Sequence, residues 1–171
     1  MEIRPPRRRD LRAYLAACQE SIDHNVHEWM PLQPGLGPRL RWHLTGLMML
    51  RLLASGRHLP PGVPRTITYW CFNNRDFVGE FQLRPSLSPA QAHSIGHIGY
   101  AVRWSQWGKG YGTQILHAAV QRLHALGLSP ILIEIHPHNA ASLRCAEKCS
   151  FQKIAESTDN SGLAVWVMQR Q

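Results

Sequence analysis

Apolar positions recur at helical spacing in the first third of the chain. Residues 11–22 and about 39–54 each carry apolar side chains three or four positions apart, which predicts two amphipathic helices. Asp10 stands where a helix N-cap is expected, and residues 2–4 form a candidate strand before it. The second helix is predicted to turn one face to the core, made of Leu40, Leu44, Leu47, Met48 and Leu52.

The rest of the chain alternates strand-like runs with two further helical stretches. Residues 66–72 and 77–84 predict a β-hairpin, because an Asn/Asp-rich turn joins them. The helix predicted over 113–126 ends at Gly127 and has an apolar face made of Ile115, Leu116, Ala119, Val120 and Leu123. The other predicted elements are strands at 94–103, 131–135, 151–156 and 163–169 and a helix at 140–149. This order indicates a mixed α/β fold.

The composition is typical of one reduced globular domain. A chain of 171 residues with 44% hydrophobic content is long enough for one core and short for two. The cysteines form no CxxC pair and the N-terminal stretch is polar, which predicts a cytoplasmic protein. No apolar run approaches the ~18 residues of a membrane span. We expect a single domain over 1–171, with the N-terminal strand and helices in 1–62 and the hairpin, central elements and closing strands in 63–171.

The net charge of +8 indicates an anionic partner without identifying it. Nucleic acid, an anionic membrane surface and a polyanionic small ligand all fit such a charge. Arginines gather in residues 4–9, but no aromatic residue is interleaved with them, which is typical of a solvated terminal segment. The sequence also lacks zinc-finger, homeodomain and RNP patterns, so a nucleic-acid-binding domain is a less favoured reading.

The most specific feature is a run of alternate glycines, Gly108, Gly110 and Gly112, between a predicted strand and a predicted helix. Free backbone N–H groups and the positive end of the helix dipole make such a turn an anion site. A P-loop requires GxxxxGK[ST] and a dinucleotide fold requires GxGxxG, and the segment matches neither. The pyrophosphate turn [RQ]xxGxG/A fits both glycines of "WGKGYG" and leaves Trp107 in its first position.

These residues resemble the GNAT superfamily of N-acetyltransferases, in which this turn binds the pyrophosphate of acetyl-CoA. The resemblance extends to "HIGYAVRWSQWGKGYGTQILHAAV" and to "NAASLRCAEKCSF", and spans about residues 95–155. It implies a GNAT-like single α/β domain with a mixed, mostly antiparallel central sheet flanked by helices. Two neighbouring strands of that sheet would splay apart to form a slot for acetyl-CoA.

The resemblance also implies the contacts of the cofactor. Main-chain groups of residues 100–102 would bind the pantetheine arm, and one N–H would face the thioester oxygen as an oxyanion donor. Asn139 either caps the following helix or contacts the cofactor, and both roles are compatible. The implied cofactor-binding residues are Tyr100, Ala101, Val102, Trp107, Gly108, Lys109, Gly110, Tyr111, Gly112, Thr113, Asn139 and Ser142.

The implied chemistry is direct attack of an uncharged amine on the thioester, which requires a base. His97 precedes "IGY", where relatives often carry an acid, and its imidazole suits proton removal near neutral pH, although an ordinary polar strand residue fits equally well. Glu80 is the second candidate base, with a surface or salt-bridge role as its alternative. Ala146 stands where many members carry a tyrosine acid, so a noncatalytic acyl-CoA-binding module remains a rival.

No metal is predicted, because the closest histidine pair, His136 and His138, has no third ligand at a recognisable spacing. The expected partners are acetyl-CoA and an amine, with a second copy of the chain as a candidate and no membrane. The acceptor groove would be formed by the first helices and the hairpin. Four aromatic residues either line that groove or pack in the core: Trp29, Trp42, Tyr69 and Trp70.

Overall fold

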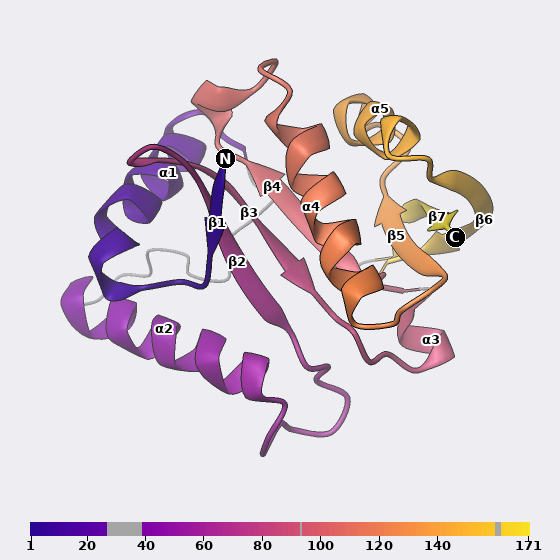
Figure 1. The fold of residues 1–171 in the computed structure, drawn as a ribbon, viewed down its shortest axis with the longest axis horizontal. Coiled ribbons are helices and arrows are strands. Elements are labelled where there is room, and N and C mark those ends of the chain that lie inside the picture. Colours follow the sequence, from indigo (N-terminus) through magenta and orange to yellow (C-terminus); the bar gives the residue numbers. More distant parts are fainter. Residues whose placement is uncertain (27–38, 93, 160–161) are drawn as a thin grey trace. The chain divides into compact units, whose positions relative to one another are not determined.

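The computed structural model describes residues 1–26, 39–92, 94–159 and 162–171, with the side chains of 39–44 and 90 left out. Figure 1 shows the arrangement of helices and strands. The chain packs as two compact units, the first made of Met1–Glu80 and Ala101–Tyr111, the second of Phe81–Tyr100 and Gly112–Gln171. The single-domain organisation expected from the sequence stays a prediction.

The predicted helices and strands are confirmed, with boundaries shifted by a few residues. The helices are α1 (Leu11–Asp23), α2 (Arg39–Ser55), α3 (Pro89–Ala92), α4 (Tyr111–Ala125) and α5 (Ala140–Lys148). The strands are β1 (Glu2–Arg4), β2 (Ile67–Asn73), β3 (Asp76–Leu83), β4 (Ile98–Val102), β5 (Ile131–Ile135), β6 (Gln152–Thr158) and β7 (Ala164–Arg170). The described residues also include the 3₁₀ turns η1 (Arg8–Asp10) and η2 (Trp104–Gln106). The short helix α3 lies where the sequence indicated only a loop.

The strands form two sheets, one with the order β1-β2-β3-β4 and one with the order β5-β7-β6. β1 pairs antiparallel with β2, and β7 pairs antiparallel with both β5 and β6. The predicted α/β fold, with antiparallel sheets flanked by helices, is therefore confirmed. β4 ends one sheet and β5 ends the other, so the two strands share no ladder.

The core of the first unit lies between its helices and its hairpin. Trp70 of β2 stacks on Tyr14 of α1 with 4.4 Å between ring centroids, and Phe77 of β3 meets Tyr14 edge to face at 5.4 Å. Trp70 is fully buried, so it packs in this core and lines no groove, whereas Tyr69 is half-buried. Trp29 lies outside the described residues, as does the side chain of Trp42.

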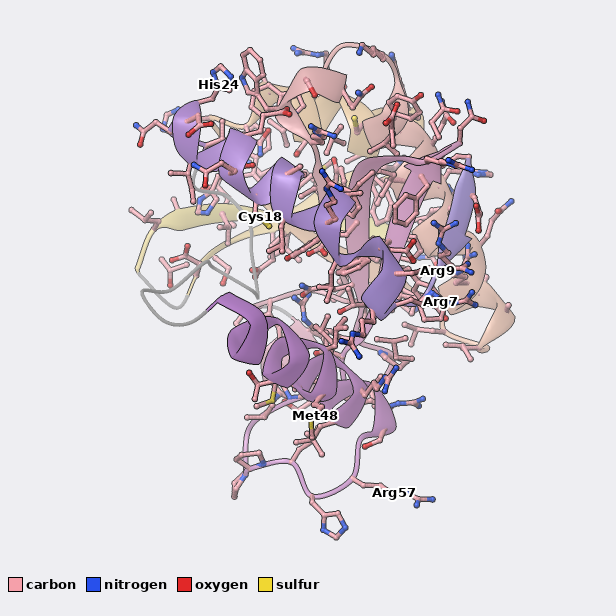
Figure 2. All side chains as sticks on the ribbon, turned by 90° about the vertical axis from the view of Figure 1, so that its left-hand side faces the viewer. Arg7, Arg9, Cys18, His24, Met48 and Arg57 are labelled. Atoms are coloured by element: carbon pink, nitrogen blue, oxygen red, sulfur yellow. The ribbon has the colours of Figure 1, made fainter. Side chains whose placement is uncertain are left out.

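The predicted core face of α2 is partly wrong. Leu47 is buried as expected, but Met48 is 67% exposed and Leu52 is 39% exposed, while Leu50 takes a core position instead. Figure 2 labels Met48 on this helix. Apolar residues occur on nearly every side of α2, so their spacing does not single out one face. The side chains of Leu40 and Leu44 lie outside the described residues.

Asp10 precedes α1 but makes no side-chain capping bond to it. Its carboxylate instead accepts hydrogen bonds from Arg4 Nε at 3.1 Å and from Arg4 Nη2 at 2.9 Å. A charge-assisted fork of this kind is stronger than a bond to a neutral backbone N–H, which explains why the expected cap is not made.

The second unit buries the predicted apolar face of α4, because Ile115, Leu116 and Leu123 are fully buried. Ala119 and Val120 are buried beside them, as predicted. Among the residues that the structure describes, none of the helices is both long and apolar enough to cross a membrane.

Candidate functional site

The glycine turn lies between η2 and α4 and has an open backbone. Gly108 and Gly110 have φ values of +74° and +79°, in the region that favours glycine. A Cβ built on either residue would meet no described heavy atom within 4 Å. The first turn of α4, which contains Gly112 and Thr113, carries no acidic residue. The space and the polarity of this turn therefore suit an anion.

Side chains around the turn bind its own backbone. Trp107 Nε1 donates to the Val102 carbonyl at 2.8 Å, although the Trp107 side chain is 52% exposed. Lys109 Nζ donates to the Ser105 carbonyl at 2.8 Å and lies 3.2 Å from Gln106 Oε1. Lys109 therefore folds back over η2. Since a carbonyl oxygen has two lone pairs, Val102 keeps the capacity to accept a second bond.

Tyr111 links the start of α4 to the hairpin. Its hydroxyl accepts a hydrogen bond from Asn73 Nδ2 at 2.9 Å, and Asn73 is the last residue of β2. The link fixes the end of the turn to a strand that is itself packed in the core of the first unit.

One local contact in the second unit joins the residues just before β4 to β5. The His97 N–H donates to the Leu132 carbonyl at 2.7 Å, and the Leu132 N–H donates back to His97 Nδ1 at 3.0 Å. Gly96 lies beside the same strand, because a Cβ on it would stand 2.9 Å from Ile133 Cα. The imidazole thus takes the place of a backbone acceptor just before β4 begins.

This contact determines which ring nitrogen carries the proton when His97 is neutral. Because Nδ1 accepts a backbone N–H, the neutral ring carries its proton on Nε2. Burial lowers the pKa of His97, and the nearby Arg84 guanidinium lowers it further. Arg84 is held there by the Ile95 and Gly96 carbonyls, to which its Nη1 donates at 3.2 and 3.3 Å. His97 can take up a second proton only by losing the bond from Leu132, and its role as a base stays a prediction.

Glu80, the second candidate base, lies at the boundary of the first unit and is 2% exposed. Its carboxylate accepts a hydrogen bond from Trp70 Nε1 at 3.1 Å. Burial raises the pKa of the Cys18 thiol to about 12, and the Glu80 carboxylate adds to that rise. The expected alternative of a surface position for Glu80 is wrong, because the residue is buried and bound by Trp70. Its catalytic role stays a prediction.

The start of α5 gathers three of the predicted residues within the second unit. Asn139 caps the helix, since its side-chain oxygen accepts the Ser142 N–H at 3.0 Å. The Tyr100 hydroxyl donates to the Ser142 carbonyl at 3.4 Å, and burial raises the pKa of Tyr100. Ala101 and Val102 follow on β4 and are half-buried. Ala146 is fully buried in α5, so no hydroxyl replaces the missing tyrosine at that position.

The histidine pair of the sequence is not grouped with a third possible metal ligand among the residues that the structure describes. His136 Nε2 lies 3.4 Å from Asp159 Oδ2, and His138 is exposed. Within the described ranges, no group of three or more His, Cys, Asp or Glu side chains is placed to hold a metal ion.

Sequence reasoning missed two residues beside the turn, Glu20 and Arg103. Arg103 Nε donates to Glu20 Oε2 at 2.8 Å, across 83 positions of sequence. No local pattern indicates a partner at that distance, because charge spacing is informative only within about one helical turn.

The α/β fold of the chain is shared with solved acetyltransferases. Mycobacterium smegmatis RimJ, solved with a CoA disulfide, is 21% identical, with a TM-score of 0.73 over 98% of this chain and 80% of RimJ. RimL, a ribosomal L7/L12 α-N-protein acetyltransferase solved with coenzyme A, is 16% identical, with a TM-score of 0.72 over 98% of this chain and 92% of RimL. The aminoglycoside acetyltransferase AAC(6')-Ib, solved with coenzyme A, is 20% identical, with a TM-score of 0.67 over 99% and 93% of the two chains.

The family follows from the sequence. The model of the acetyltransferase (GNAT) domain matches residues 1–152. The chain therefore belongs to the GNAT acetyltransferase family and is an acyltransferase, as the glycine turn and the asparagine-containing segment predicted.

Proposed function

We propose that the protein moves an acetyl group from acetyl-CoA to a primary amine, by direct attack in a ternary complex. The observation that carries the proposal is the turn with open, positive-φ glycines directly before α4. Family membership supports acetyl transfer in general. The acetyltransferase yncA from Salmonella typhimurium was solved with acetyl-CoA and RimL with coenzyme A, which supports the same cofactor here.

The chemical groups that the described residues offer suit the parts of the acyl donor, acetyl-CoA. The backbone N–H groups from Gly108 to Thr113, at the N-terminus of α4, would bind the pyrophosphate. Main-chain groups of Tyr100, Ala101 and Val102 would bind the pantetheine amides, and one N–H would face the thioester oxygen. Trp107 and Lys109 would contact the cofactor at the turn, and Asn139 and Ser142 would contact it from the start of α5.

The reaction needs a proton to leave the amine and a thiolate to depart. His97 and Glu80 are the candidate acceptors of the amine proton. His97 would have to give up its bond from Leu132 to act, which makes Glu80 a serious competitor. Since Ala146 offers no hydroxyl, the thiolate would take its proton from water, near the positive end of α5.

For the acceptor we favour an amine of low positive charge, such as a peptide N-terminus or a small amine. RimL acts on a ribosomal protein and AAC(6')-Ib on an aminoglycoside, so related structures do not choose between them. The net charge of +8 opposes a polycationic acceptor, because like charges repel the approaching substrate. A cytoplasmic location and a homodimer remain part of the proposal.

The test is calorimetric titration with acetyl-CoA of the wild type, Gly110→Glu and Gly127→Glu. Gly127 is a matched control, because its φ of +78° and its open surroundings are those of Gly110, but it follows α4 instead of preceding it. We expect micromolar binding by the wild type and by Gly127→Glu, and none by Gly110→Glu. Absence of binding by the folded wild type would overturn the proposal.

A transfer assay separates the proposed enzyme from the noncatalytic module. Release of free CoA thiol on addition of an amine panel supports transfer, whereas tight acetyl-CoA binding without thiol release from any amine supports the module. Binding to DNA with a steep salt dependence and no response to acetyl-CoA would select the nucleic-acid-binding alternative.

A further inference from the structure

Glu20, in the last turn of α1, holds the loop that leads into the glycine turn. Its carboxylate accepts hydrogen bonds from Arg103 Nε at 2.8 Å and from the Ser105 N–H at 2.6 Å, and it lies 2.7 Å from Arg103 Nη2. The two charged side chains are only 16% and 21% exposed. The pair is therefore shielded from water, which makes it stronger than an ordinary surface ion pair.

The hydrogen bonds continue from Glu20 to the turn without a break. The Ser105 N–H binds Glu20, while the Ser105 carbonyl binds Lys109 Nζ at 2.8 Å. Lys109 stands between the two open glycines, and Trp107 is tied to the Val102 carbonyl at 2.8 Å. All of these residues belong to the first unit.

A ring contact reinforces the same connection. His24, the residue directly after α1, stacks on Trp104 of η2 with 3.5 Å between ring centroids and an interplanar angle of 8°. Figure 2 shows His24 at that end of the helix. α1 thus fixes both the backbone and a side chain of the loop, and α1 itself is anchored by Tyr14 and Cys18 in the core.

We propose that Glu20 is a positioning residue, which holds the glycine turn in the conformation that binds the pyrophosphate of acetyl-CoA. This inference rests on the proposed function. Backbone N–H groups bind an anion well only when they are already oriented, since ordering a flexible loop costs free energy at the moment of binding. The loop from Arg103 to Gly110 has one short 3₁₀ turn of its own, so its order depends on its contacts with α1, β4 and β3, where the Arg103 N–H donates to the Val78 carbonyl at 3.0 Å.

The direction in which acetyl-CoA affinity changes distinguishes a positioning role of Glu20 from a purely electrostatic one. Glu20 is an acid close to a site for a polyanion, so removing its charge would strengthen binding if charge alone mattered. Loss of positioning weakens binding instead. Burial raises the pKa of Glu20, but the bonds from Arg103 and Ser105 outweigh it and the pKa is lowered, so the carboxylate is ionised at neutral pH.

The experiment compares wild type, Glu20→Gln and Asp23→Asn by calorimetric titration with acetyl-CoA. Asp23 is the matched control, because it lies on α1 and its carboxylate accepts a hydrogen bond from Gln19 Nε2 of the same helix at 2.9 Å. We expect the Kd to rise about tenfold for Glu20→Gln, as for a lost charge-assisted bond, and to stay unchanged for Asp23→Asn.

A second acyl donor distinguishes a positioning role from general destabilisation of the protein. S-acetylpantetheine lacks the pyrophosphate, so kcat/KM with this donor is expected to be the same in wild type and Glu20→Gln, while kcat/KM with acetyl-CoA falls. A loss with both donors would mean that the substitution only destabilises the protein and would overturn the inference. In the wild type, acetyl-CoA but not S-acetylpantetheine is expected to slow hydrogen exchange in α1, because coupling between two sites is reciprocal.

The two proposals fail in different ways. If the wild type binds acetyl-CoA and Glu20→Gln binds it equally well or more tightly, the positioning role is wrong and the proposed function stands. If the folded wild type does not bind acetyl-CoA, both are wrong.

Discussion

Gly96 offers the sharpest test of how the backbone just before β4 packs against β5. Its φ is +60°, and a Cβ at this position would stand 2.9 Å from Ile133 Cα and 3.1 Å from both Glu134 N and the Leu132 carbonyl oxygen. These are backbone atoms of β5, which cannot rotate out of the way as a flexible side chain can. Gly96→Ala therefore adds both backbone strain and a steric clash.

The expected loss in the free energy of unfolding is the sum of the backbone strain and the steric clash. A non-glycine residue in the left-handed region costs about 1–2 kcal/mol. Inserting a methyl group into a tightly packed site costs about 1–3 kcal/mol more. We therefore expect Gly96→Ala to lower the free energy of unfolding by about 2–5 kcal/mol, a large share of the ~5–15 kcal/mol typical of a folded protein.

Urea unfolding of Gly96→Ala and Gly127→Ala, followed by circular dichroism, measures the difference. Gly127 has a φ of +78° and no described heavy atom within 4 Å of its Cβ position, so Gly127→Ala carries the strain without the clash. Its expected loss is about 1–2 kcal/mol, with an unchanged denaturant slope. Equal losses in the two variants would refute the reasoning, because they would mean that β5 does not lie against Gly96.

Two further predictions concern His97 and Asn139. The pKa of His97 is lowered in the folded protein, so the unfolded chain binds the extra proton first, and stability should fall as the pH drops below about 6.5 until the folded pKa is reached. Urea unfolding between pH 8 and pH 5 should show less of this loss in His97→Gln, and an equal loss in both proteins would exclude His97 as its source. If His97 is also the base, His97→Ala should flatten the lower limb of the pH profile of kcat/KM, and an unchanged profile would remove it from the mechanism. Asn139→Ala removes the cap on the Ser142 N–H and should cost about 0.5–2 kcal/mol of stability; weaker acetyl-CoA binding without a lower Tm would show that the cofactor contact is the main role instead.

The glycine turn and the two elements around it are readable from the sequence because their signals are local. Glycine at Gly108 and Gly110 is needed for the backbone of the turn itself, and the apolar face of α4 follows from a repeat of 3.6 residues. Asn139 caps α5 through a bond to a residue three positions away, which is also a local signal. Features of this kind depend on neighbours within about one turn of chain.

The partners of the polar side chains depend on residues that are distant in sequence. His97 binds Leu132 across 35 positions, and Arg103 binds Glu20 across 83. Asp10 stands at the N-cap position, yet its carboxylate binds Arg4, six positions away, and not the first turn of α1. Met48 and Leu50 differ in exposure because only the neighbouring core decides which side of an apolar helix is covered.

The sequence by itself thus determined the family, the order of the elements and the glycine turn, since each follows from short patterns and backbone requirements. Only the tertiary structure decided that the imidazole of His97 is held by β5, that Glu80 is buried against Trp70, and that α1 reaches the turn through Glu20. The physical reason is that hydrogen bonds and burial are settled by which segments pack together, and segments far apart in sequence carry no local mark of each other.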